Sequence, residues 1–166
     1  MRLTEKVRKA INDQINAEMW SSNLYLSMSM FLKHEGYDGF SAWMMMQSQE
    51  ELGHAYEMAD FVNKRGGKVE ITKVDAVPTT FDGPLDIFEK AYEHECKVTE
   101  LIEGVVKVAS EERDMATQDF FWKFVREQVE EEDSASQIVS DIKLAGDLHI
   151  SLIDHSIMER RRSDKK

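Results

Sequence analysis

The chain has 166 residues, enough for one domain with a substantial hydrophobic core. Its net charge is −11, and such an acidic surface should repel nucleic acid and anionic membranes while attracting metal cations. The single cysteine, Cys96, excludes an intrachain disulfide. We find neither a signal-peptide core nor a run of apolar residues long enough for a membrane span. We therefore expect a cytoplasmic protein without nucleic-acid or membrane partners.

Apolar residues recur at steps of three or four along most of the chain, which predicts an all-α protein. Thr4 is an expected N-cap, the pair Gly66-Gly67 is a helix stop, and Pro84 suits the first position of a helix. The tail 161–166 is expected to fray. The predicted helices span residues 4–34, 39–65, 84–112, 115–145 and 148–160.

The connections between these helices predict how they are arranged. The short turns near 35–38 and 113–114 predict two antiparallel hairpins. A helix of about 28 residues is about 42 Å long, and a connection of about 17 residues can stretch to about 55–60 Å. The connection before Pro84 can therefore cross the whole length of the hairpins. We predict a single domain over 1–166, a four-helix bundle with one long crossover and a short fifth helix.

Each of the four long apolar stripes is interrupted near its middle by polar side chains, and none carries a lysine or arginine. The midpoints of antiparallel helices coincide, so these side chains should meet at one level inside the bundle. Burying unpaired carboxylates costs several kcal/mol each, so such a layer requires a cation. The charged or amide side chains at this level are Glu18, Gln47, Glu51, His54, Glu95, Gln128 and Glu131.

The composition of this layer predicts two metal ions. Glu51 and His54 are three residues apart, so they face the same way on one helix. The four carboxylates carry as much negative charge as two divalent cations carry positive charge. We expect Glu51 to bridge the two ions. Carboxylates with one imidazole suit iron, manganese or zinc.

Most of these polar residues lie in five segments, which span residues 14–18, 22–26, 49–54, 92–95 and 127–132. These segments resemble the non-haem ferritins of bacteria and archaea, and the resemblance extends over essentially the whole chain. It implies the ferritin-like fold and an iron storage protein with ferroxidase activity, which oxidises Fe(II) with dioxygen or peroxide and deposits Fe(III) mineral. It also implies a homo-oligomer, expected as a hollow 24-mer shell, and no haem.

The resemblance also implies site residues. Glu18, Glu51 and His54 match the ligands of a first iron ion. Glu51 with Glu95 and Glu131 matches the ligands of a second.

Further roles follow from the same resemblance. Gln128 matches a residue beside the second ion, and Tyr25 matches a tyrosine next to the centre, either as a packed hydrogen-bond partner or as an electron donor. A third iron ion is implied at a separate group of carboxylates: Glu50, Glu127, Glu130 and Glu131.

One position departs from the family pattern. Related ferritins often have a tryptophan where this chain has Lys123, and Trp122 lies one residue earlier. One residue rotates a helical side chain by about 100°, so an electron-donor role for Trp122 is in doubt. We expect His94, His149 and His155 to be surface histidines.

An alternative function is a di-iron oxidase or peroxidase without storage, similar to rubrerythrin. Such sites carry Glu-x-x-His twice, whereas the second copy here reads Gln128-x-x-Glu131. The same difference argues against a haem-binding bacterioferritin.

Overall fold

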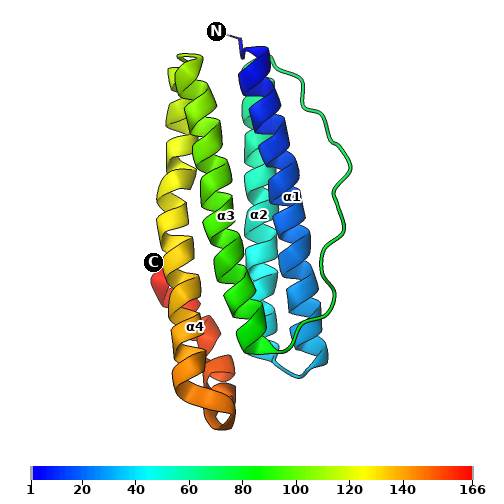
Figure 1. The fold of residues 1–166 in the computed structure, drawn as a ribbon, viewed down its shortest axis with the longest axis vertical. Helices are drawn as coiled ribbons and strands as arrows, with labels where there is room; N and C mark the ends of the chain where they lie inside the picture. The colour runs from blue at the N-terminus through cyan, green and yellow to red at the C-terminus, as the bar shows by residue number, and fades with distance from the viewer. Residues whose placement is uncertain (1, 166) are drawn as a thin grey trace.

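The computed structural model describes residues 2–165, which form helices and connecting segments, with no strand among them. The all-α prediction is thus confirmed, and four helices run side by side (Figure 1). Their bounds are α1 Glu5–His34, α2 Asp38–Lys64, α3 Pro84–Glu111 and α4 Met115–Asp164.

Thr4 and Pro84 begin helices as expected, and Asp114 of the predicted turn begins another. Thr4 is the N-cap of α1, where its hydroxyl accepts a hydrogen bond from the Val7 N–H at 3.4 Å. Pro84 occupies the first turn of α3, where its missing N–H costs nothing. Asp114 caps α4, and its carboxylate accepts the Thr117 N–H at 3.1 Å. These caps fix the helix starts close to the predicted positions.

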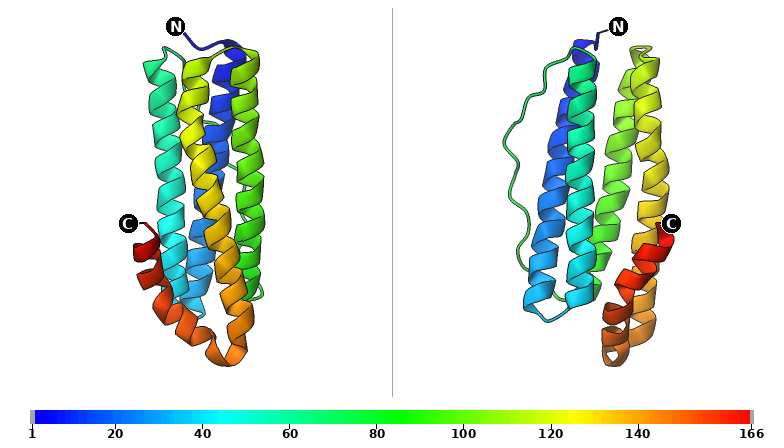
Figure 2. Two further views of the ribbon diagram at one scale, coloured as in Figure 1. Left: turned by 90° about the vertical axis from the view of Figure 1, so that its left-hand side faces the viewer. Right: turned by 180° about the vertical axis from the view of Figure 1, so that it is seen from behind.

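The bundle has the predicted topology. α1 packs chiefly against α2, and α3 packs chiefly against α4, each pair joined by a short turn. The connection between α2 and α3 runs along the outside of α1, so α2 and α3 point in the same direction (Figures 1 and 2).

Polar side chains of α1 hold this crossover in place. They lie on one side of the helix and donate hydrogen bonds to successive carbonyl oxygens of the crossover. The donors are Asn12, Asn16, Trp20 and Ser27, and the acceptors belong to Lys68, Lys73, Ala76 and Pro78. Hydrogen bonds from α1 side chains to its carbonyl oxygens therefore fix the crossover against α1.

The hydrophobic core consists of two clusters. One surrounds Phe121 and Phe124 and includes the first half of α1. The other surrounds Phe40 and Phe88 and includes the second half of α1. Between them lie buried polar side chains from all four helices, as the interrupted stripes predict. These are Glu18, Ser22, Gln47, Ser48, Glu51, Glu95 and Gln128.

The C-terminal part of the chain differs from the prediction. The fifth helix expected at 148–160 is not a separate element. It is the part of α4 beyond a break at Gly146, whose φ of 64° and ψ of −178° suit only glycine. The chain folds back there and lies against the bundle (Figure 2). The expectation of a frayed tail from Arg161 is wrong, because α4 continues to Asp164 and Arg161 is buried.

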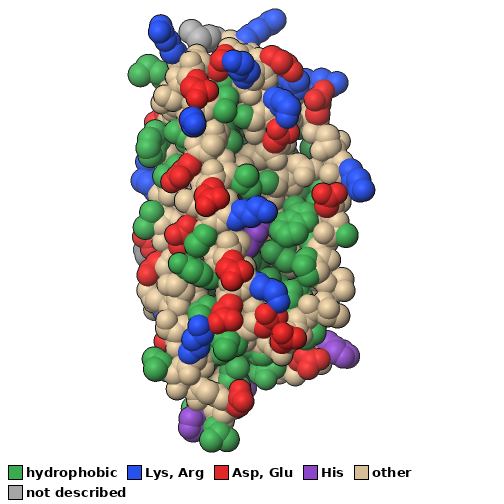
Figure 3. All heavy atoms as spheres, in the orientation of Figure 1, with side chains coloured by type: hydrophobic (Ala, Val, Ile, Leu, Met, Phe, Trp, Pro, Cys, Tyr) green, Lys and Arg blue, Asp and Glu red, His purple; other side chains and the backbone are tan. Residues whose placement is uncertain are grey.

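The surface carries acidic and basic side chains interspersed with hydrophobic ones (Figure 3). Several large apolar side chains near the break in α4 are strongly exposed, including Leu144 and Leu148. Among the residues that the structure describes, no helix is long and apolar enough to cross a membrane.

Candidate metal centre

Three ligand-type side chains from two helices meet in the buried polar layer. Glu18 comes from α1, whereas Glu51 and His54 come from successive turns of α2. One ligand atom of each lies within 4.8 Å of the others. The Nδ1 atom of His54 is 3.4 Å from Oε2 of Glu51 and 4.0 Å from Oε2 of Glu18. This spacing places two carboxylates and one imidazole around a single point.

The two carboxylates each have an oxygen without a hydrogen-bond partner. Within residues 2–165, Oε2 of Glu18 and Oε2 of Glu51 are buried and accept no hydrogen bond, while Oε1 of Glu18 accepts one from Gln14 at 2.9 Å. Buried carboxylate oxygens are normally satisfied, so these two require an additional partner. A divalent cation between them fits this donor set.

Glu95 of α3 faces the same layer and is held by hydrogen bonds. The Tyr25 hydroxyl donates to Oε1 of Glu95. The side-chain amide of Gln128 donates to Oε2 of Glu95 at 3.0 Å. Thr99, one turn along α3, lies 3.3 Å from the same amide nitrogen. These hydrogen bonds therefore fix the orientation of the Glu95 carboxylate.

Glu131 of α4 completes the set of four carboxylates. Its Oε2 accepts a hydrogen bond from the side-chain amide of Gln47 at 3.0 Å. The amide oxygen of Gln47 in turn accepts one from Arg161 at 2.8 Å. Among the described residues, no lysine or arginine forms an ion pair with Glu18, Glu51, Glu95 or Glu131.

Burial, together with neighbouring carboxylates, destabilises the charged forms of the four carboxylates. Burial, with the neighbouring Glu51, raises the pKa of Glu18 well above its ordinary value. Burial and the charge of Glu131 raise the pKa of Glu95 to about 7. Burial likewise raises the pKa of Glu51 and of Glu131. A bound cation would reverse these shifts, because it stabilises the ionised carboxylates.

Tyr25 is also controlled by its surroundings. Burial and the nearby charge of Glu95 raise its pKa well above the ordinary tyrosine value. The hydroxyl therefore keeps its proton and donates it to Glu95 in a hydrogen bond.

His54 uses its two nitrogens differently. Its Nδ1 faces Glu18 and Glu51, and its Nε2 lies 3.0 Å from Oε2 of Glu127. Burial lowers the pKa of His54, but the neighbouring carboxylates of Glu127 and Glu51 outweigh this effect and raise it to about 11. Glu127 thus orients the ring as second partners of metal-binding histidines do, leaving Nδ1 toward the buried carboxylates.

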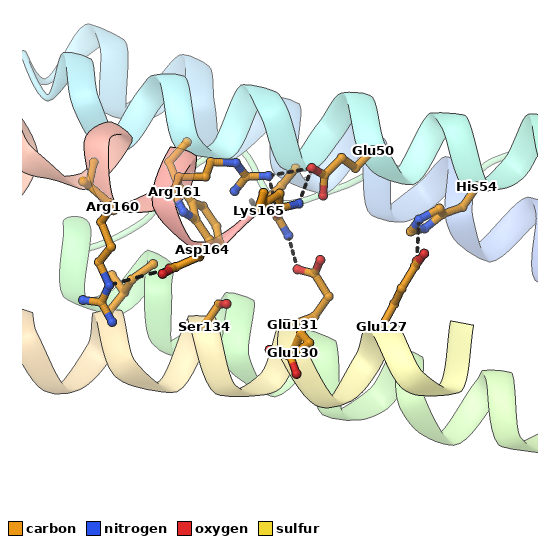
Figure 4. Close-up of a pocket in the computed structure, with 14 residues that line it drawn as sticks. Glu50, His54, Glu127, Glu130, Glu131, Ser134, Arg160, Arg161, Asp164 and Lys165 are labelled. Carbon is orange, nitrogen blue, oxygen red and sulfur yellow. Dashed lines mark hydrogen bonds and ion pairs between the residues drawn. The ribbon is translucent and has the colours of Figure 1, made fainter. Parts of the chain in front are cut away.

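The carboxylates expected at a third ion line a cavity of about 430 Å³ beside this layer (Figure 4). Glu127 points across it from α4 to His54 on α2, and Glu130 is exposed. Glu50 does not stand free, because Arg161 lies 3.1 Å from its Oε1 and Lys165 forms a second ion pair with it. The structure therefore gathers these carboxylates around one cavity but gives three of them protein partners: Glu50, Glu127 and Glu131.

The remaining candidate residues fall outside the centre. Trp122 is exposed, in agreement with its shifted position. His149 and His155 are exposed as expected, but the expectation for His94 is wrong. His94 is partly buried between the rings of Trp20 and Tyr25.

Sequence reasoning missed several partners of the centre. Gln14 donates a hydrogen bond to Glu18, and Thr99 accepts one from Gln128. In the sequence, only their spacing of four residues from Glu18 and Glu95 indicates these contacts. Nothing in the sequence indicated that Arg161 and Lys165 reach the site, since a charged tail ordinarily extends into solvent.

The comparisons with known proteins identify the family of the chain. The ferritin-like domain model matches residues 8–145. The chain is 55% identical over 158 residues to a bacterial non-haem ferritin of Bacteroides fragilis, covering 95% of this chain and 99% of that one. It is 38% identical to the bacterial non-haem ferritin of Campylobacter jejuni over 145 residues, 87% of each chain.

Solved structures give the same result. The crystal structure of an open-pore ferritin from the hyperthermophilic archaeon Archaeoglobus fulgidus superposes with a TM-score of 0.90 at 46% identity. The match covers 93% of this chain and 96% of that chain. With its four-helix topology and its buried carboxylate layer, the chain belongs to the ferritin family.

Proposed function

We propose that this protein is a ferroxidase that stores iron. Two Fe(II) ions are its substrates at the buried layer, one held by Glu18, Glu51 and His54 and the other by Glu51, Glu95 and Glu131. Each Fe(II) gives one electron to dioxygen, and the resulting Fe(III) moves on to a mineral. Iron of both oxidation states prefers the oxygen and imidazole ligands found here.

The pair of unsatisfied buried oxygens on Glu18 and Glu51 is the observation that supports this proposal most strongly. A structural polar layer would pair these atoms with protein donors, as it does for Glu95 and Glu131. Carboxylate oxygens that lack a hydrogen-bond partner at the centre of a well-packed bundle fit a site that repeatedly takes up and releases a cation.

The protein's own groups would set the geometry of the reaction. Gln128 and Tyr25 hold Glu95, so that its oxygens keep their direction when a metal arrives. We propose that Tyr25, next to the centre, acts either as this hydrogen-bond partner of Glu95 alone or also as an electron donor. The centre lies between two hydrophobic clusters, which limit access of bulk water.

We also propose an accessory metal site at the cavity beside the centre. Glu50, Glu127 and Glu130 line it together with Glu131 and would accept a third iron ion. Its exposed side offers a route for iron between the centre and the mineral.

Assembly follows from the same proposal. We propose that copies of the chain form a closed 24-mer shell in the cytoplasm. The exposed leucines around the break in α4, Leu144, Leu148 and Leu152, would be buried between copies. The shell would enclose the mineral.

Iron retention tests this function directly. Fe(II) is added in air in increasing amounts, and the iron that co-elutes with protein on a sizing column is measured. Storage predicts that retained iron rises far beyond the two or three ions per chain that the ligands can hold, in a particle of shell size. A plateau at that number in a small oligomer would instead indicate a di-iron oxidase or peroxidase similar to rubrerythrin.

A further inference from the structure

The segment of α4 beyond Gly146 packs along one face of α2. Its Asp154 is buried, and the Oδ1 atom accepts a hydrogen bond from the Phe40 N–H at 2.8 Å. At Gly39 a side chain could not fit, because an added Cβ would lie 1.7 Å from the carbonyl oxygen of Asp154. This close approach fixes the segment at the start of α2.

From that anchor the two helices stay in contact toward the cavity. Ile157 lies in the same hydrophobic cluster as Trp43. One turn later, the guanidinium of Arg161 lies 4.8 Å from the centre of a Trp43 ring. The row on α2 continues at Gln47 and Glu50.

Two cations of this segment end in the proposed accessory site. Arg161 donates to Gln47 at 2.8 Å and lies 3.1 Å from Oε1 of Glu50. Lys165, at the end of the helix, forms an ion pair with the same oxygen of Glu50. Both cations line the cavity that also holds Glu127 (Figure 4). The positive charge expected from a metal ion is thus partly supplied by the protein itself.

The two cations differ in how firmly they are held. Arg161 is only 5% exposed, stacks on Trp43 and has two partners. The Lys165 side chain is 47% exposed and has a flexible stem. Displacing Arg161 would leave Gln47 and Glu50 without this buried donor. Lys165, in contrast, can exchange Glu50 for water at little cost.

We propose that the C-terminal segment provides a built-in counter-charge for the accessory site, and that a metal ion binds there by displacing Lys165 from Glu50. Arg161 is then a positioning residue, which stays in place and holds Gln47 and, through it, Glu131. This inference rests on the accessory site of the proposed function. It adds that the last turn of α4 sets how tightly the third ion is held.

The size of the effect follows from the exposure of the ion pair. A half-exposed lysine–carboxylate pair contributes little, so abolishing the competition should tighten binding of the third ion by about two- to fivefold. The ion proposed at Glu18, Glu51 and His54 should be unaffected, because Lys165 forms no ion pair with Glu18 or Glu51 within the described part of the chain, whereas its charge reaches Glu131.

The experiment is calorimetric titration of the assembled, metal-free protein with Zn²⁺, which binds without redox chemistry. Glu130→Ala identifies the accessory step, because that step should disappear in this variant. The test variant is Lys165→Gln. The matched control is Lys143→Gln, which removes the same charge from α4 but breaks an ion pair with Glu89 outside the cavity. Lys165→Arg restores the charge.

We expect the accessory step to tighten in Lys165→Gln, to be unchanged in Lys143→Gln and to return toward the wild-type affinity in Lys165→Arg. A third ion that appears only in Lys165→Gln would support the same inference. Equal or weaker affinity in Lys165→Gln than in Lys143→Gln would overturn the competition while leaving the accessory site standing. A titration with no third ion in any variant would overturn both.

Discussion

Glu51 occupies the position on which the two proposed ions depend. It lies at the middle of α2, where one of its oxygens has no hydrogen-bond partner among the described residues and the other can serve a second ion. The sequence allowed this residue to be predicted, because a carboxylate interrupts an apolar stripe and His54 follows at the next turn. The hydrogen-bonding partners could not be predicted in the same way, since Gln14 and Thr99 show no periodicity of their own.

Replacing Glu51 with alanine should abolish fast Fe(II) oxidation, because a bridging ligand is lost from both ions at once. We expect a loss of at least about a hundredfold in the initial rate, consistent with removal of about 3 kcal/mol of stabilisation. Stopped-flow absorbance of Fe(III) formation measures it. Glu57→Ala is the control on the same helix, since Glu57 is exposed and pairs with Lys123. Normal kinetics in Glu51→Ala would refute the dinuclear assignment.

Tyr25→Phe separates two roles of the tyrosine. If the hydroxyl only orients Glu95, the variant should lower Zn²⁺ affinity and oxidation rate together by a few-fold, reflecting one lost buried hydrogen bond. A normal affinity with an altered ratio of iron oxidised to dioxygen consumed would identify an electron donor. Titration with Zn²⁺ and an oxygen electrode distinguish the two results.

At the scale of helices, the sequence predicted most of the fold because local signals agreed with one another. Thr4, Pro84 and Asp114 begin helices through caps or a fixed φ angle, and these signals need no knowledge of tertiary contacts. The C-terminal segment was misjudged because its stability comes from contacts far along the chain. Trp43 and Gln47 hold Arg161 in place, and no pattern in the sequence near Arg161 predicts these partners.

The break at Gly146 should control where this segment lies. Gly146→Ala strains the observed conformation and favours an uninterrupted helix, which would carry Arg161 away from α2. We expect faster tryptic cleavage after the C-terminal arginines. Gly104→Ala is the matched control, because Gly104 lies within α3 with nothing within 4 Å of an added Cβ, and it should stabilise the protein by about 0.5–1 kcal/mol. Equal cleavage of the two variants would contradict this role of Gly146.

At the scale of the whole molecule, the buried carboxylates should make the metal-free protein less stable as the pH rises. The pKa of Glu95 is about 7 in the folded chain and near 4.5 when exposed, so the folded state binds more protons in between. The pKa of His54, raised to about 11, acts in the same direction above pH 6.5. That of His94, lowered to about 4, acts in the opposite direction, but chiefly below pH 6.5, where this ring is charged only in the unfolded state.

We therefore expect the unfolding temperature of metal-free protein to fall between about pH 6.5 and about pH 8.5, with Glu95 contributing on the order of 1 kcal/mol per chain. Saturating Zn²⁺ should reduce this dependence, since the cation replaces the protons, and Glu95→Gln should weaken it without metal. Differential scanning calorimetry in a pH series measures the effect. A rising unfolding temperature over this range would show that the carboxylates are not buried together.

The central claim is that four carboxylates from four helices hold two metal ions at one level of the bundle. Crystals grown without metal and soaked anaerobically in Fe(II) would test it by anomalous scattering at the iron edge. The proposed dinuclear centre predicts two peaks per chain about 3.5–4 Å apart, with Glu51 between them. A single peak beside Glu18 and His54, or none in the buried layer, would contradict the claim.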